Sequence, residues 1–419
     1  MAPGNNLAKV WSGPVKAPPE TLPLACVMGD MDLVRPLGLA GIACAVVAPA
    51  GSPPVHSRFV RTTIPWKDFW DGGEALVETL MRFGSAQPAP PVLFFEEDSQ
   101  LLLVSRHRAR LASAFRFAIA DPELVEDLVD KGRFQALAER HGLPVPATRR
   151  IRPAADGRPA ALGLRFPVVI KPLTRDHRWS KIGGAGKAVR AETPEALRDL
   201  WPRLSAAGVE LLVQELIPGP ETRMESYHVY VDEQGGIAGE FTGRKVRTLP
   251  PSLGHSTALE LSDAPDVAAL GRALVRKLGL HGVAKLDFKR DPDGTLHLLE
   301  INPRFNLWHH LGAVAGVNLP ALVHADMSGT PRPAVSPARA GATWCRPLDD
   351  WRAARAAGVP TAAWLPWMLR CDANASLDWR DPMPCLNGEV YQRARRLGGA
   401  WLRRLRPRPP EATPRDAGA

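Results

Sequence analysis

The segment from Val283 to Arg304 constrains the fold more than any other part of the sequence. Two stretches, KLDFKR and TLHLLEIN, alternate as strands do, and the DPDG sequence between them (Asp291 to Gly294) is a strong turn signal. We therefore expect an antiparallel hairpin whose successive side chains point to opposite faces. The alternation places on one face Asp287, Leu298, Glu300 and Asn302. It turns toward a core Leu286, Phe288, Leu299 and Ile301.

Two carboxylates and an amide oxygen on one face are unfavourable as plain structure. Asp287 and Glu300 would repel each other and lose hydration if nothing paired with them. A hard divalent cation such as Mg²⁺ (or Mn²⁺) resolves the conflict, because it takes a few protein oxygens and completes its shell with water and phosphate. An exposed face with Lys285 or Arg304 as ion-pair partner explains the same residues, so both interpretations stay open at this point.

Basic side chains form the second pattern. Lys171 lies in an apolar strand, VVIKPL, where a lysine is rarely buried without a partner. Lys187 follows the glycines of GGAGK, including Gly184, whose bare backbone N–H groups can approach an anion. This string lacks the Walker A spacing, and an ordinary hairpin is the alternative. Cations that could match a polyphosphate are Lys131, Lys171, Lys187, Arg244, Lys245 and Arg304.

The stretch LLVQELIPG is a strand that is apolar except at Gln214 and Glu215. Such a strand suits a nucleotide base, since backbone groups at its edge can bond the purine while aliphatic side chains cover the faces. A central strand that simply ends at Pro218-Gly219 is an equally good interpretation of this fragment.

The first part of the chain alternates strands and helices, beginning with LPLACVMGD and IACAVVAP and continuing to PVLFFEED. This order predicts a parallel α/β layer of about 100 residues. The cluster Glu96-Glu97-Asp98 follows a strand at its carboxyl end, where open α/β sheets bind ligands. A solvated loop is the alternative for this cluster.

Composition excludes several classes of protein. The 419 residues call for two or three domains, and 45% hydrophobic with 23% charged residues is typical of globular chains. The net charge is +9, but residues 391–419 hold eight arginines against Glu411 and Asp416, which leaves only +3 for the rest. A nucleic-acid groove across the body is therefore not expected. The five cysteines are scattered without a CxxC pair, which indicates a reducing, cytoplasmic location.

The arginine-rich end contains Leu397, Trp401, Leu402 and Leu405 among its basic residues. It has the composition of an amphipathic helix that makes a weak peripheral contact with an anionic membrane, and a solvated terminus is the alternative.

Taken in order, these pieces resemble the ATP-grasp superfamily over roughly residues 121–329. The order is DKxxF (Asp130 to Phe134), FPVVIKP, the glycine loop, VQELIPG, TGRKVR and LEINPRF. The pattern is most similar to the carboxylate–amine ligase branch that includes D-aspartate ligase-like proteins. There too a Rossmann-like domain precedes the core and a DPxP element follows it, here Asp381 to Pro384.

The resemblance implies a role for each matching position. Lys131 and Lys171 correspond to phosphate-contacting lysines, and Gly184 and Lys187 to a loop that closes over the phosphates. Residues implied for the adenine and ribose are Gln214, Glu215, Leu216, Ile217 and either Glu221 or Glu225. Implied Mg²⁺ ligands are Asp287, Glu300 and Asn302. Groups implied for the phosphoryl group or substrate carboxylate are Arg304, Lys245, Arg244 and Arg247.

The implied fold combines α/β and α+β parts in three regions. These are a Rossmann-like domain (1–120), an ATP-grasp domain of two α+β subdomains that clasp ATP (121–330), and a small helical extension with the basic tail (331–419). The implied activity joins a small carboxylate to an amine through an acyl phosphate, with ATP and Mg²⁺ as cofactors and a homodimer as one assembly.

Two other functions stay open beside the ligase: a bicarbonate-activating enzyme of the carboxylase or carbamoyl-phosphate type, and an ATP-binding sensor without turnover. The sequence departs from such ligases at Trp308, His309 and His310, which stand where small residues are common near the acceptor. One of these histidines could accept a proton from the amine, and packed histidines are the alternative.

Overall fold

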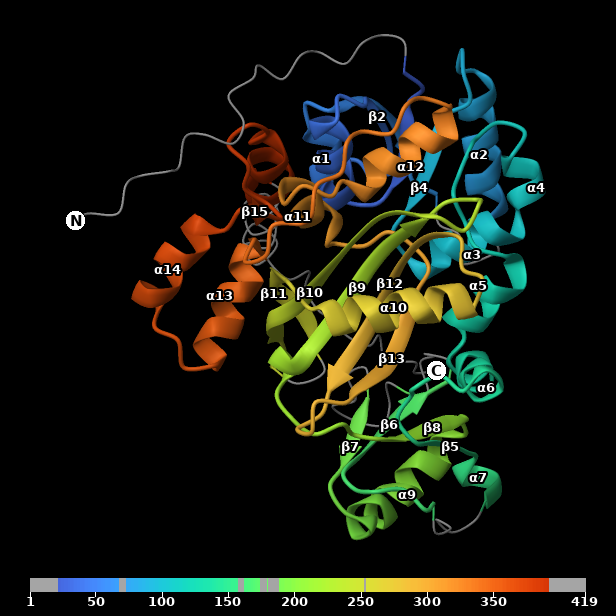
Figure 1. Ribbon diagram of the computed structural model, residues 1–419, viewed down its shortest axis with the longest axis vertical. Helices are drawn as coiled ribbons and strands as arrows, with labels where there is room; N and C mark the ends of the chain where they lie inside the picture. Colours follow the sequence, from blue (N-terminus) through green and yellow to red (C-terminus); the bar gives the residue numbers. More distant parts are fainter. Residues whose placement is uncertain are drawn as a thin grey trace, which may run out of the picture.

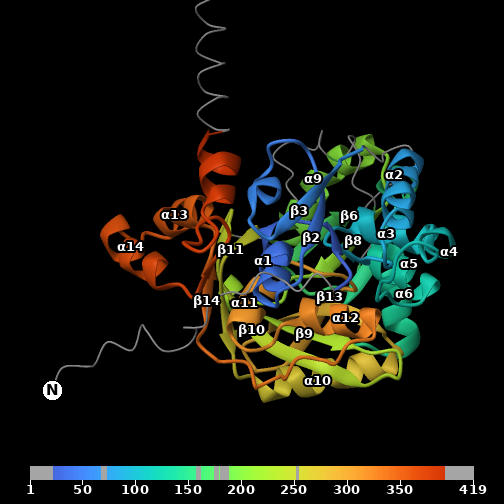
Figure 2. The ribbon, with the colours of Figure 1, turned by 90° about the horizontal axis from the view of Figure 1, so that it is seen from above.

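A computed structural model describes residues 22–67, 73–156, 162–173, 179, 188–251 and 254–391. The described chain forms three sheets with helices around them (Figure 1, Figure 2). The glycine loop with Gly184 and Lys187, and the arginine-rich end, lie outside the described residues. Among the described helices, none combines the length and the apolar character that crossing a bilayer requires.

The N-terminal sheet is parallel, with the strand order β3-β2-β1-β4, as the alternating sequence predicts. Its core strands, ACVM and VLFF, are buried on both faces, which is typical of parallel sheets covered by helices. The strands are β1 (Ala25–Met28), β2 (Cys44–Ala48), β3 (Val60–Pro65) and β4 (Val92–Phe95). The helices are α1 (Met31–Leu39), α2 (Glu74–Ser85), α3 (Asp98–Arg106) and α4 (Arg108–Leu111), with a 3₁₀ turn at Pro53–His56.

A small antiparallel sheet forms the far end of the molecule, with the order β5-β8-β6-β7 (Figure 1). Helix α9 begins after Thr193, whose side chain accepts a hydrogen bond from the Ala196 N–H as an N-cap, and it buries Trp201 and Leu204 against the sheet. The strands are β5 (Thr148–Ile151), β6 (Val168–Pro172), β7 (Val189–Ala191) and β8 (Leu211–Glu215). The helices are α7 (Pro153–Asp156) and α9 (Pro194–Ala207).

The largest sheet has seven strands in the order β13-β12-β9-β10-β11-β14-β15. One face packs on α10, and the other joins a core shared with the N-terminal sheet, α11 and α12. The strands are β9 (Met224–Val231), β10 (Ile237–Leu249), β11 (His255–Ser262), β12 (Gly282–Arg290), β13 (Leu296–Asn302), β14 (Thr343–Cys345) and β15 (Ala373–Asn374). The helices are α10 (Pro265–Lys277), α11 (His309–Val314) and α12 (Leu319–Ser328).

The predicted hairpin is present as β12 and β13, and the turn at Asp291–Gly294 is confirmed. Asp287 pairs with Glu300 and Lys285 with Asn302, so these side chains share one face. A bulge follows Asp287, because Phe288 pairs with Leu298 and leaves Leu299 unopposed. The predicted faces of Leu298 and Leu299 were therefore wrong: Leu298 is buried in the core, and Leu299 lines the cavity described below.

Two further expectations need correction. The apolar stripe of Leu124, Leu128, Phe134 and Leu137 predicts one helical stretch after Asp121. The structure has two helices there, α5 (Pro122–Val129) and α6 (Lys131–His141). Asp130 separates them because its backbone is extended and its side chain accepts a hydrogen bond from the Arg133 N–H, which caps α6. The family resemblance suggests a loop for the TGRK segment (Thr242 to Lys245), but this segment belongs to the long strand β10.

The C-terminal extension contains helices α13 (Pro347–Ala356) and α14 (Thr361–Arg370) and a π-helical stretch (Pro384–Tyr391). It also supplies β14 and β15 to the large sheet, so it is not wholly helical. Asp381 ties it to the N-terminal domain by accepting hydrogen bonds from the Ser57 hydroxyl at 2.6 Å and the Arg58 N–H at 2.9 Å. The DPxP element therefore connects the C-terminal extension to the N-terminal domain.

Arg35 provides a second tie. This side chain is fully buried in α1 and donates hydrogen bonds to the carbonyl oxygens of Asn374, Ala375 and Ser376 at 2.5, 3.0 and 3.0 Å. We predict that Arg35→Met lowers the free energy of unfolding by at least about 2 kcal/mol, because the carbonyls lose a charged donor. Urea unfolding measures the change. The control is Arg370→Met, at an exposed position in α14, whose free energy of unfolding should stay within about 0.5 kcal/mol of the parent. Equal effects of the two variants would contradict a stabilising role of the Arg35 hydrogen bonds.

Candidate functional site

A cavity of about 640 Å³ lies between the small sheet and the β12–β13 hairpin. Side chains of β6 and β8 form one wall, and those of β12 and β13 form the opposite wall. The start of α3 contributes Asp98 at one side. This volume is within the range of small-molecule sites, about 300–1,000 Å³.

The hairpin wall carries the predicted oxygen donors. Asp287 is 2% exposed; the Ser226 hydroxyl donates to its Oδ1, and the Lys285 Nζ lies 2.6 Å from its Oδ2. Burial favours the protonated carboxyl, but Lys285 and Lys245 outweigh it and hold the pKa of Asp287 below its usual range. Glu300 stands opposite and accepts a hydrogen bond from the Asn302 side-chain amide at 3.1 Å.

The lysine–aspartate alternative from the sequence is thus also present, since Lys285 pairs with Asp287. The set around it is made of hard oxygens, which is the ligand chemistry that Mg²⁺ prefers. Within the described part of the chain, no three His, Cys, Asp or Glu side chains come together as a metal site. Two carboxylates and one amide fit a cation that takes most of its ligands from water and phosphate.

Three lysines face this cavity from different elements. Lys171 in β6 donates to the Gln214 Oε1 at 3.0 Å, and Lys131 at the start of α6 donates to the Pro172 carbonyl at 2.8 Å. Burial lowers the pKa of Lys171, and the charge of Glu300 across the cavity raises it in part. Lys245 in β10 forms neither a hydrogen bond nor an ion pair with another described residue, so its ammonium is available to an anion.

The strand end after β8 presents a free backbone donor. The Glu215 and Leu216 N–H groups donate to the carbonyls of Ala147 and Pro167, at 2.9 and 3.0 Å. The Ile217 N–H finds no acceptor among the described residues, although Ile217 is 6% exposed and lines the cavity. A buried unpaired donor is costly, so this position is suited to an acceptor atom of a bound molecule.

The structure distinguishes Glu221 from Glu225, the two acidic residues that the resemblance implies for the ribose. Glu221, in the 3₁₀ turn Glu221–Arg223, lines the cavity. Glu225 instead accepts a hydrogen bond from the Arg290 Nε at 2.5 Å and does not line it. Of the two, Glu221 is therefore the candidate for a sugar hydroxyl.

Known proteins with similar sequences agree with the family resemblance of the motifs. Residues 208–345 match the model of the family "ATP-grasp in the biosynthetic pathway with Ter operon". D-aspartate ligase of Enterococcus faecium is 28% identical over 289 residues, which cover 66% of this chain and 68% of that protein. D-alanine–D-alanine ligase of Stutzerimonas stutzeri is 29% identical over 178 residues, 42% of this chain and 54% of that enzyme.

Solved structures share the fold. The ADP complex of N5-carboxyaminoimidazole ribonucleotide synthetase superimposes with a TM-score of 0.58 at 15% identity, covering 77% of this chain and 81% of that one. L-amino acid ligase from Bacillus licheniformis gives 0.56 at 15%, covering 74% and 75%. The chain has the ATP-grasp fold, and its residues 208–345 match an ATP-grasp family model.

The ATP-grasp cavity gathers most of the residues that the sequence singled out. They are Lys131, Lys171, Gln214, Glu215, Leu216, Ile217, Glu221, Lys245, Asp287, Glu300 and Asn302. Arg244 and Arg247 do not line it: Arg244 pairs with Glu260, and Arg247 pairs with Asp350 and stacks on Trp367. Arg244 lies on the opposite face of β10 from Lys245, and a bulge between Lys245 and Arg247 turns Arg247 to the face of Arg244. Their own partners hold both arginines away from the cavity.

Arg304 also lies outside the cavity wall. Its guanidinium donates to the Asp98 carboxylate at 2.5 Å, the Glu96 carbonyl at 2.7 Å and the Asn302 Oδ1 at 3.3 Å. It therefore links the oxygen donors of the hairpin to the predicted acidic cluster after β4. The sequence indicated both partners separately but gave no signal that they meet.

The two histidines after the hairpin are packed in the core. His309 and His310 are 0% and 3% exposed, and burial lowers the pKa of each to about 3. His309 contacts the Phe305 ring at 5.2 Å between centroids and meets His228 edge-on. Neither lines the cavity, so their positions agree with the packed alternative.

Glu96, close to the cavity, is a carboxyl group whose proton affinity is raised by burial. Burial raises the pKa of its carboxyl to about 7, partly offset by the hydrogen bond from the Asp30 N–H. An unfolded glutamate has a pKa of about 4.3, so between that pH and 7 the folded state holds a proton that the unfolded state has released. Stability therefore falls as the pH rises through this window.

We predict that Glu96→Gln removes the decrease in stability that accompanies the rise in pH. The variant should gain stability relative to the parent between about pH 5 and pH 8, because glutamine cannot ionise. Urea unfolding midpoints across this range measure the difference, and pH profiles that run parallel would contradict the altered proton affinity.

Proposed function

We propose that this protein is an ATP-dependent carboxylate–amine ligase that joins two small molecules through an acyl phosphate. The observation that carries the proposal is the pairing of Asp287 with Glu300 on the wall of a lysine-lined cavity, in a chain related to amino-acid ligases. In this proposal the Ile217 N–H bonds the adenine, Glu221 bonds the ribose, and Lys131 and Lys171 hold the phosphates.

The first step transfers the terminal phosphate. A substrate carboxylate oxygen attacks the γ-phosphorus, the bond from that phosphorus to the β-phosphate oxygen breaks, and ADP leaves. Lys245 offsets charge on the transferred group, since its ammonium has no other described partner. Mg²⁺ held by Asp287, Glu300 and Asn302 would neutralise phosphate charge. Arg304 acts as a positioning residue that orients Asn302 through its hydrogen bond.

The second step forms the amide. The amine nitrogen attacks the acyl carbon, the bond from that carbon to the phosphate oxygen breaks, and inorganic phosphate leaves while the amine loses its proton. No protein nucleophile is needed, so positioning and electrostatics supply most of the rate. Exclusion of water from the acyl phosphate is then essential, because hydrolysis would waste it.

The carboxylase alternative is less well supported. D-aspartate ligase matches 66% of this chain at 28% identity, whereas the carbamoyl phosphate synthase large chain of Deinococcus radiodurans matches 44% at 27%. The biotin carboxylase structure shares only the fold at its level of identity. A sensor without turnover leaves unexplained why the cavity keeps two facing carboxylates, which cost stability unless a cation binds them.

ADP release tests the three functions. We predict that release with ATP and Mg²⁺ rises several-fold only when a carboxylate and an amine from a panel of L- and D-amino acids are both present. Stimulation by bicarbonate alone would favour the carboxylase. ATP binding without stimulation by any pair would contradict the ligase and favour the sensor.

Variants test the oxygen donors. Asp287→Asn or Glu300→Gln should reduce turnover by about 100-fold or more while circular dichroism stays unchanged, because each removes charge that holds the metal-bound phosphates. Asp293→Asn, on the exposed turn of the same hairpin, is the matched control and should keep parental activity. Parental turnover in either cavity variant would remove the metal assignment.

A further inference from the structure

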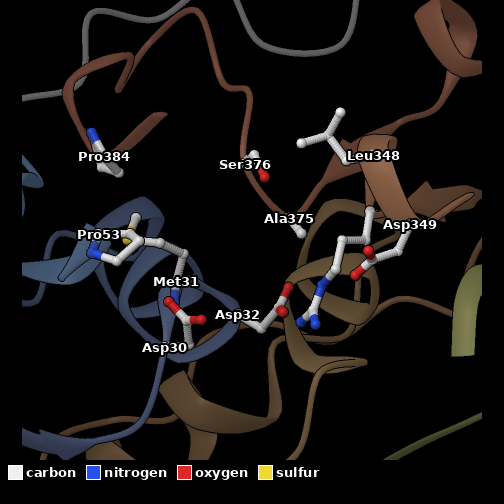
Figure 3. Close-up of a pocket in the computed structure, with 10 residues that line it drawn as sticks. Asp30, Met31, Asp32, Pro53, Leu348, Asp349, Ala375, Ser376 and Pro384 are labelled. Carbon is white, nitrogen blue, oxygen red and sulfur yellow. The ribbon is translucent and has the colours of Figure 1, made fainter. Parts of the chain in front are cut away.

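A second, smaller cavity of about 180 Å³ lies where the N-terminal domain meets the C-terminal extension (Figure 3). Asp30 and Asp32 come from the start of α1, and Ala375, Ser376 and Pro384 come from the extension. Arg346, Leu348 and Asp349, at the start of α13, complete the wall. The cavity therefore exists only because the extension folds back onto α1.

Asp32 is the most unusual group in this wall. It is 3% exposed, and its Oδ1 accepts a hydrogen bond from the Trp344 Nε1 at 3.1 Å. Its second oxygen accepts no hydrogen bond from a described residue, and the carboxyl forms no ion pair within the described chain. Burial raises the pKa of Asp32 well above its usual range, and the charges of Glu96 and Asp30 raise it further, while Arg346 and Arg35 lower it in part. A ligand cation placed at the second oxygen would stabilise the ionised carboxylate.

Arg346 offers the opposite charge. Its guanidinium is half-buried in the wall, and its charge acts on Asp32, although no ion pair or hydrogen bond joins it to a described side chain. Arg35 nearby donates to three carbonyls and lies 4.0 Å from the Asp378 carboxylate. A molecule that carries both charges can therefore lie between Asp32 and Arg346, because the planar donors of a guanidinium match the two oxygens of a carboxylate. Asp349 is partly used by Arg352 at 3.4 Å.

We propose that this cavity binds the amine substrate as a small amino acid, with its ammonium group at Asp30 and Asp32 and its carboxylate at Arg346. The inference rests on the proposed ligase function, and it names the class of molecule that supplies the amine. A metal ion fits less well, since the described chain has no cluster of three metal-ligating acidic, histidine or cysteine side chains here.

Size supports an amino acid of few atoms. An internal cavity of about 150 Å³ is enough for a six-carbon ring, so about 180 Å³ admits a molecule of alanine size or slightly larger. Leu348, Met31 and Pro384 supply apolar surface for a short side chain. A nucleotide is excluded by volume.

The position also suits a second substrate. The Asp30 N–H donates to the Glu96 Oε2 at 2.8 Å, and the Glu96 carbonyl accepts from Arg304 at 2.7 Å. Arg304 in turn bonds Asn302 on the wall of the ATP cavity. The two cavities are thus neighbours separated by Glu96 and Arg304.

Isothermal titration calorimetry without ATP tests the cavity directly. The probes are glycine, L-alanine, D-alanine, β-alanine and D-aspartate, with propionate and ethylamine as analogues that lack one charged group. We expect at least one amino acid to bind, and both analogues to bind at least about tenfold more weakly. Failure of every amino acid to bind, or equal binding of propionate, would overturn the proposal.

Variants assign the binding to this wall. Arg346→Ala and Asp32→Asn should each weaken binding of that amino acid about tenfold or more, while Arg355→Ala, elsewhere on α13, should not. In the ligase assay Arg346→Ala should raise the amine KM and leave the ATP KM unchanged. Unfolding midpoints of all three variants, measured by circular dichroism, verify that they are folded.

The outcomes separate the two proposals. Amino-acid binding that Arg346→Ala abolishes, in a protein with no ligase turnover, would keep this cavity assignment and overturn the ligase function. Ligase turnover whose amine KM is unchanged in both Arg346→Ala and Asp32→Asn would keep the ligase and overturn the cavity assignment.

Discussion

The lysine-lined cavity depends on the pairing of Asp287 with Glu300 across β12 and β13. Two carboxylates directly opposite each other destabilise a sheet unless a positive charge lies between or beside them. The charges of Lys285 and Lys245 favour the ionised form of Asp287, whose Oδ1 accepts from Ser226, while Glu300 accepts a hydrogen bond from the Asn302 amide. The hairpin therefore holds an excess of negative oxygen where the opposite wall supplies lysines. A phosphate chain with its counter-cation satisfies both walls at once.

The sequence predicted this hairpin face because alternation and a DPDG turn are local signals. The Rossmann-like sheet and the α9 N-cap at Thr193 were predictable for the same reason. The faces of Leu298 and Leu299 were not, since a bulge inserts one residue without changing the local alternation. The break at Asp130 was missed because an apolar stripe continues through it, and only the capping hydrogen bond shows where one helix ends.

The site contacts that the sequence did not predict join residues that are distant along the chain. Ser226 reaches Asp287 because β9 pairs with β12, and Arg304 reaches Asp98 because two domains meet. The spacing of residues along the chain does not predict either contact. The same holds for Arg244 and Arg247, whose basic character suggested a role at the phosphates, whereas Glu260 and Asp350 take up their charges. Only Lys245, between them on the opposite face of β10, is left for an anion.

Glu96 lies between the two cavities and forms hydrogen bonds toward both. Its side chain accepts from the Asp30 N–H, beside the acidic cavity, and its backbone carbonyl accepts from Arg304, beside the ATP cavity. A lysine-rich wall attracts phosphate, and the aspartates at the start of α1 attract an ammonium group, so reactants of opposite charge would be held on opposite sides of one residue. With a pKa raised to about 7 by burial, Glu96 is close to half-protonated near neutral pH. In the proposed ligase, this carboxyl group, which accepts from the Asp30 N–H at 2.8 Å, is the candidate acceptor for the proton that an ammonium loses as it becomes a nucleophilic amine.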